Sequence, residues 1–277
     1  LTKLVETTLD PFTFVAAAAA LDRLGNPLGQ KRLREAMQAK DNAEAGPGYT
    51  CFGGPGVGSP QTLLVWAPGS VPTRAPDGLA MRVSKGSVLV MQVHYNLAKY
   101  KGVGDRSIAR LERAASAPSQ VALLLPVADP GNLKIPAGAA DATQVINIPI
   151  GVVLNYAKLP NLTLYGNVPH MHTRGTRITT LVNGEPLVEL PRWDFNWQQV
   201  YIFQAPVKLT AADVLTVECR FNNTAENQPV VNGQRLPVRD VGWGENTTDE
   251  MCLSYVMAAV PASFTGLALN PPVPQTE

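Results

Sequence analysis

Two of the three histidines in the chain, His170 and His172, lie two residues apart. They belong to "GNVPHMHTRGTR" (Gly166 to Arg177), a segment that we expect to form a β-strand. Because side chains at positions i and i+2 of a strand project from the same face, both imidazole rings can reach one point. This spacing suggests a metal site. The alternative is a pair of surface or hydrogen-bonded histidines.

A metal site needs at least one further ligand, and the remaining histidine of the chain is His94, in "QVHYN". His94 falls on the far side of a predicted domain boundary. The best further candidate is Met251, at the start of a predicted strand within "GWGENTTDEMCLSYV". A lone methionine usually fills apolar core space. From the residues alone, that alternative stays open.

Composition and charge limit the classes of partner that the chain can have. The 277 residues can bury a substantial core in one or two domains. Lys and Arg together number 23 against 22 Asp and Glu, a formal net charge of +1, so no global field attracts nucleic acid or an anionic membrane. The longest apolar run, Phe12 to Leu21, is about half of the roughly 20 residues that a spanning helix needs. No transmembrane segment is therefore expected.

Turn-forming residues recur along most of the chain and leave room for strands rather than for long helices. The 24 prolines and 23 glycines are scattered, which suits many short strands. Short helices are expected only between residues 13 and 44. Most of the predicted strands alternate apolar and polar residues, as strands with one buried face do. These strands are Thr62 to Ala67, Ser87 to Leu97, Ser119 to Val127, Arg177 to Gly184, Asp213 to Asn223 and Met251 to Val260.

The predicted fold class is mainly β, with two antiparallel β-sandwich, jelly-roll-like domains and short helices near the N-terminus. Prolines and glycines interrupt the strand pattern in "VADPGNLKIPAGAAD" (Val127 to Asp141), which predicts a domain boundary. We expect an N-terminal domain over residues 1–127, incomplete at its start, and a C-terminal domain over residues 128–277. This boundary separates His94 from the other two histidines.

Six motifs are shared with one known family. The C-terminal half has "PHMHTRG" (Pro169 to Gly175), "WDFNWQQVY" (Trp193 to Tyr201) and "WGENTTDEM" (Trp243 to Met251). The N-terminal half has "GYTCFGGPG" (Gly48 to Gly56), "WAPG" (Trp66 to Gly69) and "LVMQVHYN" (Leu89 to Asn96). Over about residues 46–260, in the right order, the chain resembles the copper type II, ascorbate-dependent monooxygenases. This is the family of peptidylglycine alpha-hydroxylating monooxygenase and dopamine beta-monooxygenase, and the likeness is closest to its bacterial members.

The resemblance implies two copper sites. His170, His172 and Met251 match the ligands of the C-terminal copper, where dioxygen binds and the substrate is hydroxylated. A thioether is a soft donor that suits Cu(I), whereas zinc takes nitrogen, thiolate or carboxylate ligands. His94 matches one ligand of an electron-storing copper in the first domain. That copper also needs an adjacent His-His pair, which this sequence lacks, so the pair is expected upstream of Leu1 or has been lost.

Three cysteines, Cys51, Cys219 and Cys252, allow at most one disulfide within the chain. Taken by themselves, they could also be three reduced, buried thiols of a cytosolic protein. The resemblance implies a bridge between Cys219 and Cys252, because the animal enzymes of the family are bridged at the matching positions. Such a bridge implies an oxidising compartment, and hence a secreted or periplasmic protein.

Two residues near the motifs bear on the substrate. Peptide-amidating members of the family hold a substrate carboxylate with an Arg two residues before the His-x-His motif and a Tyr four residues after the Met. Here Val168 occupies the first position and Tyr255 the second, so peptide amidation is not expected. Tyr255 is either a substrate residue or a core residue of its strand. Arg174 either offers a charge near the site or is solvated.

The function implied by the resemblance is hydroxylation of an activated C–H bond of a small molecule. Dioxygen would be the oxidant, copper the cofactor, and ascorbate or a similar small molecule the reductant. Two other classes remain open. The chain could be a copper-binding protein with a single site and no turnover, or a structural subunit of a larger assembly in which a partner protein does the chemistry.

Overall fold

The computed structural model describes residues 27–51, 54–57, 61–71, 74–95, 106–231 and 233–264. The chain divides into two compact units. The first comprises residues 1–61, 82–95 and 266–277, and the second comprises residues 62–81 and 96–265. None of the helices in the described part of the chain is long and apolar enough to cross a membrane.

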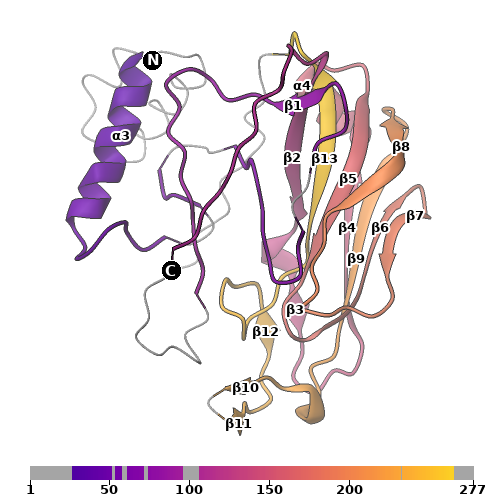
Figure 1. Ribbon diagram of the computed structural model, residues 1–277. Coiled ribbons are helices and arrows are strands. Elements are labelled where there is room, and N and C mark those ends of the chain that lie inside the picture. Colours follow the sequence, from indigo (N-terminus) through magenta and orange to yellow (C-terminus); the bar gives the residue numbers. More distant parts are fainter. Residues whose placement is uncertain are drawn as a thin grey trace. The chain divides into compact units, whose positions relative to one another are not determined.

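The described part of the first unit contains helix α3 (Pro27–Asn42), shown in Figure 1. On its exposed side, Arg32 forms an ion pair of 3.0 Å with Glu35, at the i,i+3 spacing that places side chains together on a helix surface. Gln30 is buried on this helix, and its side-chain amide donates a hydrogen bond of 2.8 Å to the carbonyl of Lys85. The predicted helical region therefore forms a helix from residue 27 to residue 42, while residues 13–26 lie outside the described residues.

Two predicted strands are wrong in the parts that the structure describes. Residues 62–67 form no strand, and neither do residues 87–95, although both segments have the expected apolar pattern. Residues 96 and 97 lie outside the described residues. Leu89 and Met91 are 58% and 55% exposed. An apolar pattern indicates which side chains share a face, but a strand also requires a neighbouring backbone to satisfy its hydrogen bonds.

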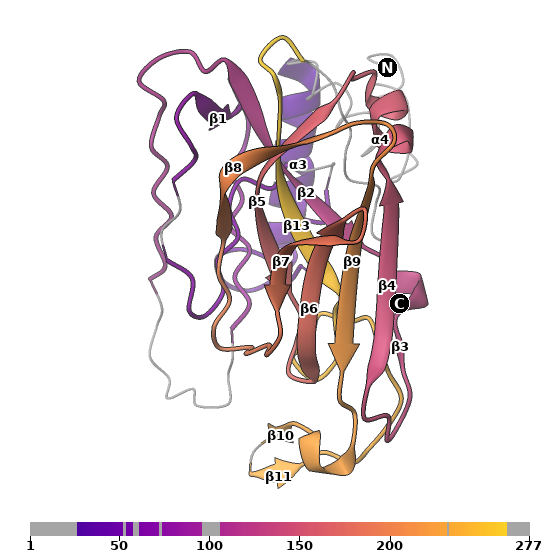
Figure 2. The ribbon, with the colours of Figure 1, turned by 90° about the vertical axis from the view of Figure 1, so that its right-hand side faces the viewer.

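The second unit is built on two larger sheets, visible in Figures 1 and 2. The five-stranded sheet has the order β1-β2-β13-β5-β8, with β1 (Leu79–Met81), β2 (Gln120–Ala128), β13 (Leu253–Pro261), β5 (Leu162–His170) and β8 (Tyr201–Leu209). The four-stranded sheet has the order β4-β9-β6-β7, with β4 (Ala142–Pro149), β9 (Val214–Phe221), β6 (Gly175–Val182) and β7 (Glu185–Leu190). All neighbours pair antiparallel except β1 and β2.

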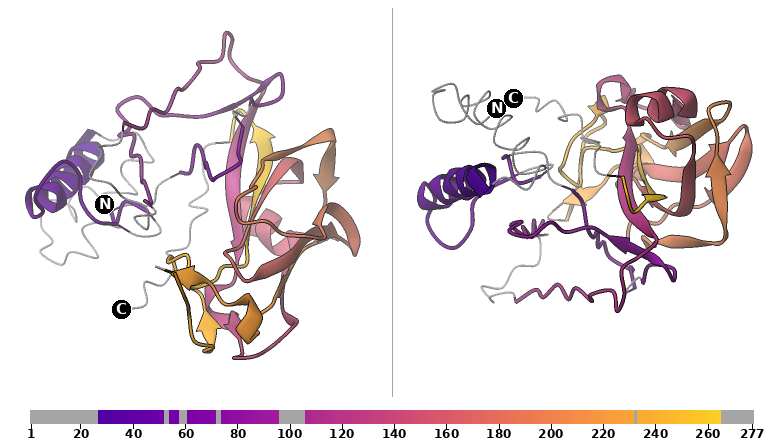
Figure 3. Two further views of the ribbon diagram at one scale, coloured as in Figure 1. Left: turned by 60° about the horizontal axis from the view of Figure 1, so that its bottom comes forward. Right: turned by 90° about the horizontal axis from the view of Figure 1, so that it is seen from above.

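Shorter elements complete this unit. They are η2 (Pro130–Asn132), β3 (Lys134–Ile135), α4 (Ile150–Ala157), η3 (Ala225–Asn227), β10 (Val230–Val231), β11 (Gln234–Arg235) and β12 (Val241–Gly242). The pairs β10–β11 and β3–β12 are both antiparallel. The β10–β11 pair lies beyond one end of the larger sheets in Figures 1 and 2, and this end comes forward in the left view of Figure 3.

The two larger sheets share one hydrophobic core. Strand β9 alternates strictly between half-buried and buried residues, the pattern of a strand with one face in the core. Ile178 and Val217 from the four-stranded sheet belong to the same buried cluster as Leu164 and Val256 from the five-stranded sheet. The prediction of a mainly β protein with antiparallel sheets is confirmed. Four predicted strands correspond to β2, β6, β9 and β13 within a few residues.

A second apolar cluster includes buried residues of β1, β2, β5 and β13. Within β5, Leu164 belongs to the first cluster, but Val168 belongs to the second. The reason is a shift in the pairing register between Leu164 and Gly166. At such an irregularity the alternation of faces is reversed, so Val168 projects from the other side of the strand than Leu164 does. His170, two residues after Val168, is therefore on the side of the sheet that carries the second cluster.

The division of the chain in space differs from a simple cut at residue 127. Strand β2 precedes that position almost entirely, yet it pairs along its whole length with β13, near the end of the chain. Strand β1 pairs in turn with β2. Residues 62–81 therefore belong to the unit that carries the larger sheets. Antiparallel pairing, rather than order along the chain, decides which strands share a sheet.

Candidate metal centre

The His-x-His segment begins in β5 and continues past its end. His170 is the last residue of the strand and lies opposite Leu253 of β13. Met171 is fully buried in the core between the two sheets, so the alternation of sides continues beyond the strand. The rings of His170 and His172 are 5.1 Å apart between centroids, at an interplanar angle of 82°. The structure thus brings the two imidazoles together, as the i,i+2 spacing predicts.

A single amide determines how His170 holds its proton. The Nδ1 atom of His170 is 2.7 Å from Oε1 of Gln198, a buried residue with 3% exposure. The Gln198 side-chain NH₂ donates to the carbonyl of Phe195 at 2.8 Å, which orients the amide with its oxygen towards the ring. Nδ1 is therefore the protonated nitrogen, and Nε2 carries the lone pair. Burial also lowers the pKa of His170, which favours the neutral ring that metals bind.

Backbone and side-chain bonds fix His172 on several sides. Its Nδ1 atom lies 3.2 Å from the carbonyl of Asp249, and because a carbonyl can only accept, Nδ1 again carries the proton. Its backbone carbonyl accepts a hydrogen bond of 3.0 Å from the indole of Trp193. The side chain is 5% exposed. Both histidines thus present the Nε2 lone pair, with Nδ1 bound to protein, which is the usual arrangement of metal-binding histidines.

Glu250, which the sequence did not single out, ties Met251 to the histidine segment. Its carboxylate is fully buried and accepts three backbone N–H groups, from His172 at 2.9 Å, Arg174 at 2.5 Å and Met251 at 3.4 Å. Burial raises the pKa of Glu250 to about 7, against the opposing effect of these donors and of the Arg174 charge. One carboxylate therefore fixes the backbones of two candidate ligands relative to each other.

Met251 approaches the histidines through the pairing of β13 with β5. Leu253 lies opposite His170. The pairing ends at these two residues, so Met251 precedes it by two positions and His172 follows it by two. Met251 is 5% exposed. Met251 is therefore a buried residue whose backbone lies near that of His172, because Glu250 binds both.

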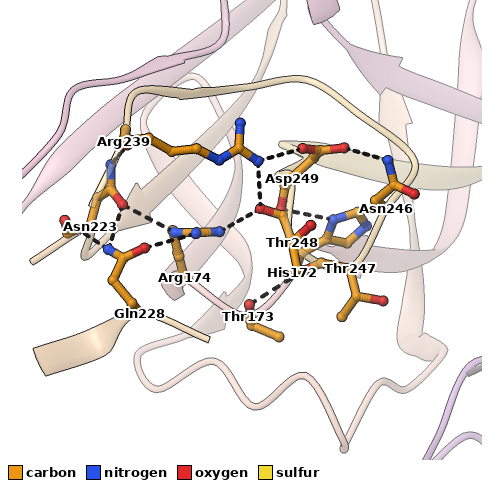
Figure 4. A network of polar contacts seen from close by, with 10 residues as sticks. All are labelled: His172, Thr173, Arg174, Asn223, Gln228, Arg239, Asn246, Thr247, Thr248 and Asp249. Carbon is orange, nitrogen blue, oxygen red and sulfur yellow. Dashed lines mark hydrogen bonds and ion pairs between the residues drawn. The ribbon is translucent and has the colours of Figure 1, made fainter. Parts of the chain in front are cut away.

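Arg174 lies in a buried polar network, drawn in Figure 4, rather than in solvent. Its side chain is fully buried, so solvation, one of the two alternatives for this residue, is wrong. Its guanidinium donates to Asn223 at 3.1 Å, to Gln228 at 2.9 Å and to the carbonyl of Thr248 at 2.8 Å. These bonds direct the charge into the protein. Arg174 therefore supports the loop that leads to Glu250.

The predicted disulfide between Cys219 and Cys252 is confirmed. Cys219 is in β9 of the four-stranded sheet, and Cys252 directly precedes β13 of the five-stranded sheet. Both residues are fully buried. The bridge thus joins the two sheets next to Met251. The third cysteine, Cys51, is a free thiol in the first unit.

The remaining site predictions concern Tyr255 and His94. Tyr255 is half-buried in β13, opposite Val168, and packs against the second apolar cluster. Burial raises the pKa of its phenol. These contacts support its role as a residue of the strand. His94 is exposed and belongs to the first compact unit, in a segment without regular secondary structure.

The residues near β5 fit a copper ion. Within the described part of the chain, no group of three or more His, Cys, Asp or Glu residues is placed to hold a metal. The candidate set is instead two imidazoles and one thioether, from His170, His172 and Met251. Soft and borderline donors of this kind suit Cu(I) better than zinc, calcium or magnesium.

The sequence could not show Gln198, Trp193 or Glu250 as supports of the site. Gln198 and Trp193 fall within the "WDFNWQQVY" motif, and Glu250 within "WGENTTDEM", so the motifs were the available signal. Each support bonds a backbone group or a ring nitrogen of a histidine far away in the sequence. Such a bond depends on the tertiary structure.

Comparison with known proteins gives one informative result. Residues 155–265 match the family model described as copper type II ascorbate-dependent monooxygenase, C-terminal domain. No curated protein matches the chain. Among solved structures, the dimeric latent PorU from Porphyromonas gingivalis is similar over 54% of this chain and 14% of its own, with 9% identity and a TM-score of 0.23. A likeness this low says nothing about function.

The matched region contains both histidines of the site, Met251, Glu250 and the disulfide. It confirms, for this part of the chain, the resemblance found in the sequence. Residues 155–265 are therefore a C-terminal domain of the copper type II ascorbate-dependent monooxygenase family.

Proposed function

We propose that this protein is a copper-dependent monooxygenase that hydroxylates an activated C–H bond of a small molecule, using dioxygen and a small reductant such as ascorbate. The main support for the proposal is the orientation of the His170 and His172 rings. Both rings are held through Nδ1, so that both present Nε2. Metal-binding histidines are typically oriented in this way.

His170, His172 and Met251 would hold the catalytic copper. Bound there, the metal would supply the redox chemistry with dioxygen that the family is named for. The protein's own part is to hold the donors in place. Glu250 binds the backbones of His172 and Met251, and Gln198 orients the ring of His170. Because these supports are buried, the donor atoms need little rearrangement when the metal binds.

The wider proposal includes a second copper and an extracytoplasmic location. His94 would contribute to an electron-storing copper in an N-terminal domain, together with a His-His pair outside this sequence.

The larger sheets of the second unit, with their shared core, support a β-sandwich for the C-terminal domain. The buried disulfide supports a secreted or periplasmic location, because such bridges persist in oxidising compartments. The near-neutral charge gives no reason to expect nucleic acid as a partner.

Substitution of Met251 tests the copper site directly. Met251→Leu conserves side-chain volume but removes the sulfur. We expect it to weaken Cu(I) binding at least about 10-fold, in line with the loss of a metal ligand or its support. Competition with a chromophoric Cu(I) chelator measures the affinity. Met257→Leu is the matched control, because Met257 is also buried but lies within β13 opposite Gly166, away from the histidines.

The outcomes separate the three functions. Equal copper affinity in Met251→Leu and in the unchanged protein would refute the proposed ligand set. Tight copper binding without oxygen consumption in the presence of ascorbate would instead favour a single-site copper-binding protein. An isolated chain that binds neither copper nor zinc would favour a structural subunit of a larger assembly.

A further inference from the structure

We propose that the turn from Trp66 to Ser70 is a positioning element of the metal site and acts on His170 through Gln198. The inference rests on the proposed metal site, because it concerns the orientation of one of its histidines. The turn is about 100 residues before His170 in the sequence, and both lie in the second compact unit.

The turn binds the backbone of Gln198 on both sides. The backbone N–H of Gln198 donates to the carbonyl of Pro68 at 3.0 Å. Its carbonyl accepts a hydrogen bond of 2.6 Å from the hydroxyl of Ser70. A further bond runs from the side chain of Gln199 to the carbonyl of Gly69. Both backbone polar groups of Gln198 are therefore bonded to this turn.

Gly69 makes this close approach possible. Its φ angle is +90°, in the region that favours glycine, and a Cβ atom there would lie 2.8 Å from the Cα of Trp197. The same Cβ would lie 2.9 Å from the carbonyl oxygen of Asn196. Both are backbone atoms, so a side chain at position 69 would push the turn away from residues 196–198. The approach thus requires glycine for two independent reasons.

The side chain of Gln198 links the position of the Gln198 backbone to the orientation of the His170 ring. The buried amide can bond His170 Nδ1 and the carbonyl of Phe195 together only while its backbone stays in place. If the turn moves, the amide loses one partner, and the His170 ring can rotate or exchange its proton between Nδ1 and Nε2. A proton on Nε2 blocks that nitrogen for a metal. His172 is held by other groups and should not respond.

The first experiment observes the rings in the metal-free protein. Nitrogen NMR of ¹⁵N-histidine-labelled protein reports which ring nitrogen carries the proton, and the chain has only three histidines to assign. We expect His170 to be protonated on Nδ1 in the unchanged protein and to become a mixture of tautomers in Gly69→Ala and in Ser70→Ala. The signals of His172 should stay the same in both variants.

Gly184→Ala is the matched control for Gly69→Ala. Gly184 has a similar φ angle of +85°, but a Cβ there meets no atom within 4 Å. It therefore reproduces the backbone strain without displacing a neighbour. Ser70→Ala removes only a hydroxyl, so it remains informative if Gly69→Ala fails to fold. His170 signals that stay unchanged in both Gly69→Ala and Ser70→Ala would overturn the inference.

The second experiment measures Cu(I) affinity by chelator competition. Residues that orient metal ligands typically contribute about 10 to 100-fold to metal affinity. We expect a loss in that range for Gln198→Leu and a loss nearer about 10-fold for Gly69→Ala. Gln198→Glu keeps an acceptor for Nδ1 and should restore most of the affinity, which a merely structural role would not predict. Equal losses in Gln198→Leu and Gln198→Glu would contradict the inference.

The two experiments also keep the two proposals apart. If the unchanged protein binds no copper, the proposed function fails, yet the NMR result still decides whether the turn orients His170. If copper binds but the His170 tautomer is the same in the turn variants as in the unchanged protein, only the inference about the turn fails.

Discussion

The two ends of the larger sheets are held together in different ways. At the histidine end, where β5 ends at His170 and β6 begins at Gly175, polar side chains such as Glu250 and Arg174 are fully buried. At the turn end, where β6 ends at Val182, the polar bonds are in contact with solvent. There Asn183 donates to Asp213 at 2.7 Å.

Loss of a polar partner costs more free energy at the histidine end than at the turn end. A buried polar group must be bonded by protein, since water cannot replace a lost partner, and each unpaired group costs free energy. At the turn end, water can substitute for a missing partner. Breaking a polar bond at the histidine end therefore costs much free energy, and the bonded groups stay fixed. The candidate ligands are at this end. Rigid supports of this kind are what a preorganised metal site requires.

The largest expected effect is that of Glu250→Ala at the histidine end. The substitution leaves three buried backbone N–H groups without an acceptor. At about 2 kcal/mol for each buried, unpaired group, we expect a loss of about 5 kcal/mol or more in the free energy of unfolding. Urea denaturation measures it.

Glu189→Ala is the control for Glu250→Ala. Glu189 forms an ion pair with Arg177, with both side chains substantially exposed. Because exposed pairs contribute at most about 1 kcal/mol, the effect should be small. Similar losses in Glu250→Ala and Glu189→Ala would remove the basis of the comparison between buried and exposed polar groups.

The second effect in size concerns the disulfide at the histidine end. Cys219 and Cys252 are 33 residues apart, and closing a loop of this length stabilises a folded chain by about 3–4 kcal/mol on the chain-entropy model. We expect the double substitution Cys219→Ala and Cys252→Ala to lower the free energy of unfolding by this amount. Because Cys252 adjoins Met251, Cu(I) affinity should fall as well. A variant that loses stability but keeps full copper affinity would show that the bridge does not help to position Met251.

The smallest effect is expected for Asp213→Asn at the turn end. The backbone N–H of Thr210, and then the side chains of Asn183 and Thr210, lower the pKa of Asp213. A carboxylate with a lowered native pKa stabilises the fold above its unfolded pKa of about 4, and this contribution disappears as the pH falls through the native pKa. The variant should therefore be slightly less stable than the unchanged protein at pH 7, with a difference that shrinks on acidification.

Urea midpoints of both proteins, compared at pH 7 and pH 3, measure the effect of Asp213→Asn. Copper affinity should stay the same, because the substitution is at the end of the sheets away from the histidines. A stability difference that is equally large at both pH values would contradict the role assigned to the Asp213 charge. A fall in copper affinity would show that the two ends are coupled.

Features with a local cause could be predicted from the residues alone. Alternation of apolar residues predicted the strands β2, β6, β9 and β13, because side chains on a strand take opposite faces in turn. The same alternation placed the rings of His170 and His172 on one side. Motif resemblance predicted the bridge between Cys219 and Cys252, and the family of residues 155–265.

The tertiary structure alone decided which segments pair and which polar groups meet. Residues 62–67 have a strand pattern but form a loop, because the pattern describes side chains and not the presence of a pairing partner. Arg174 looked equally suited to solvent or to the site, and only packing revealed its buried bonds. Glu250 reaches His172 over 78 positions, and Gln198 reaches His170 over 28. Hydrogen bonds over such separations depend on how the sheets bring distant backbones together, and no local pattern of residues encodes that.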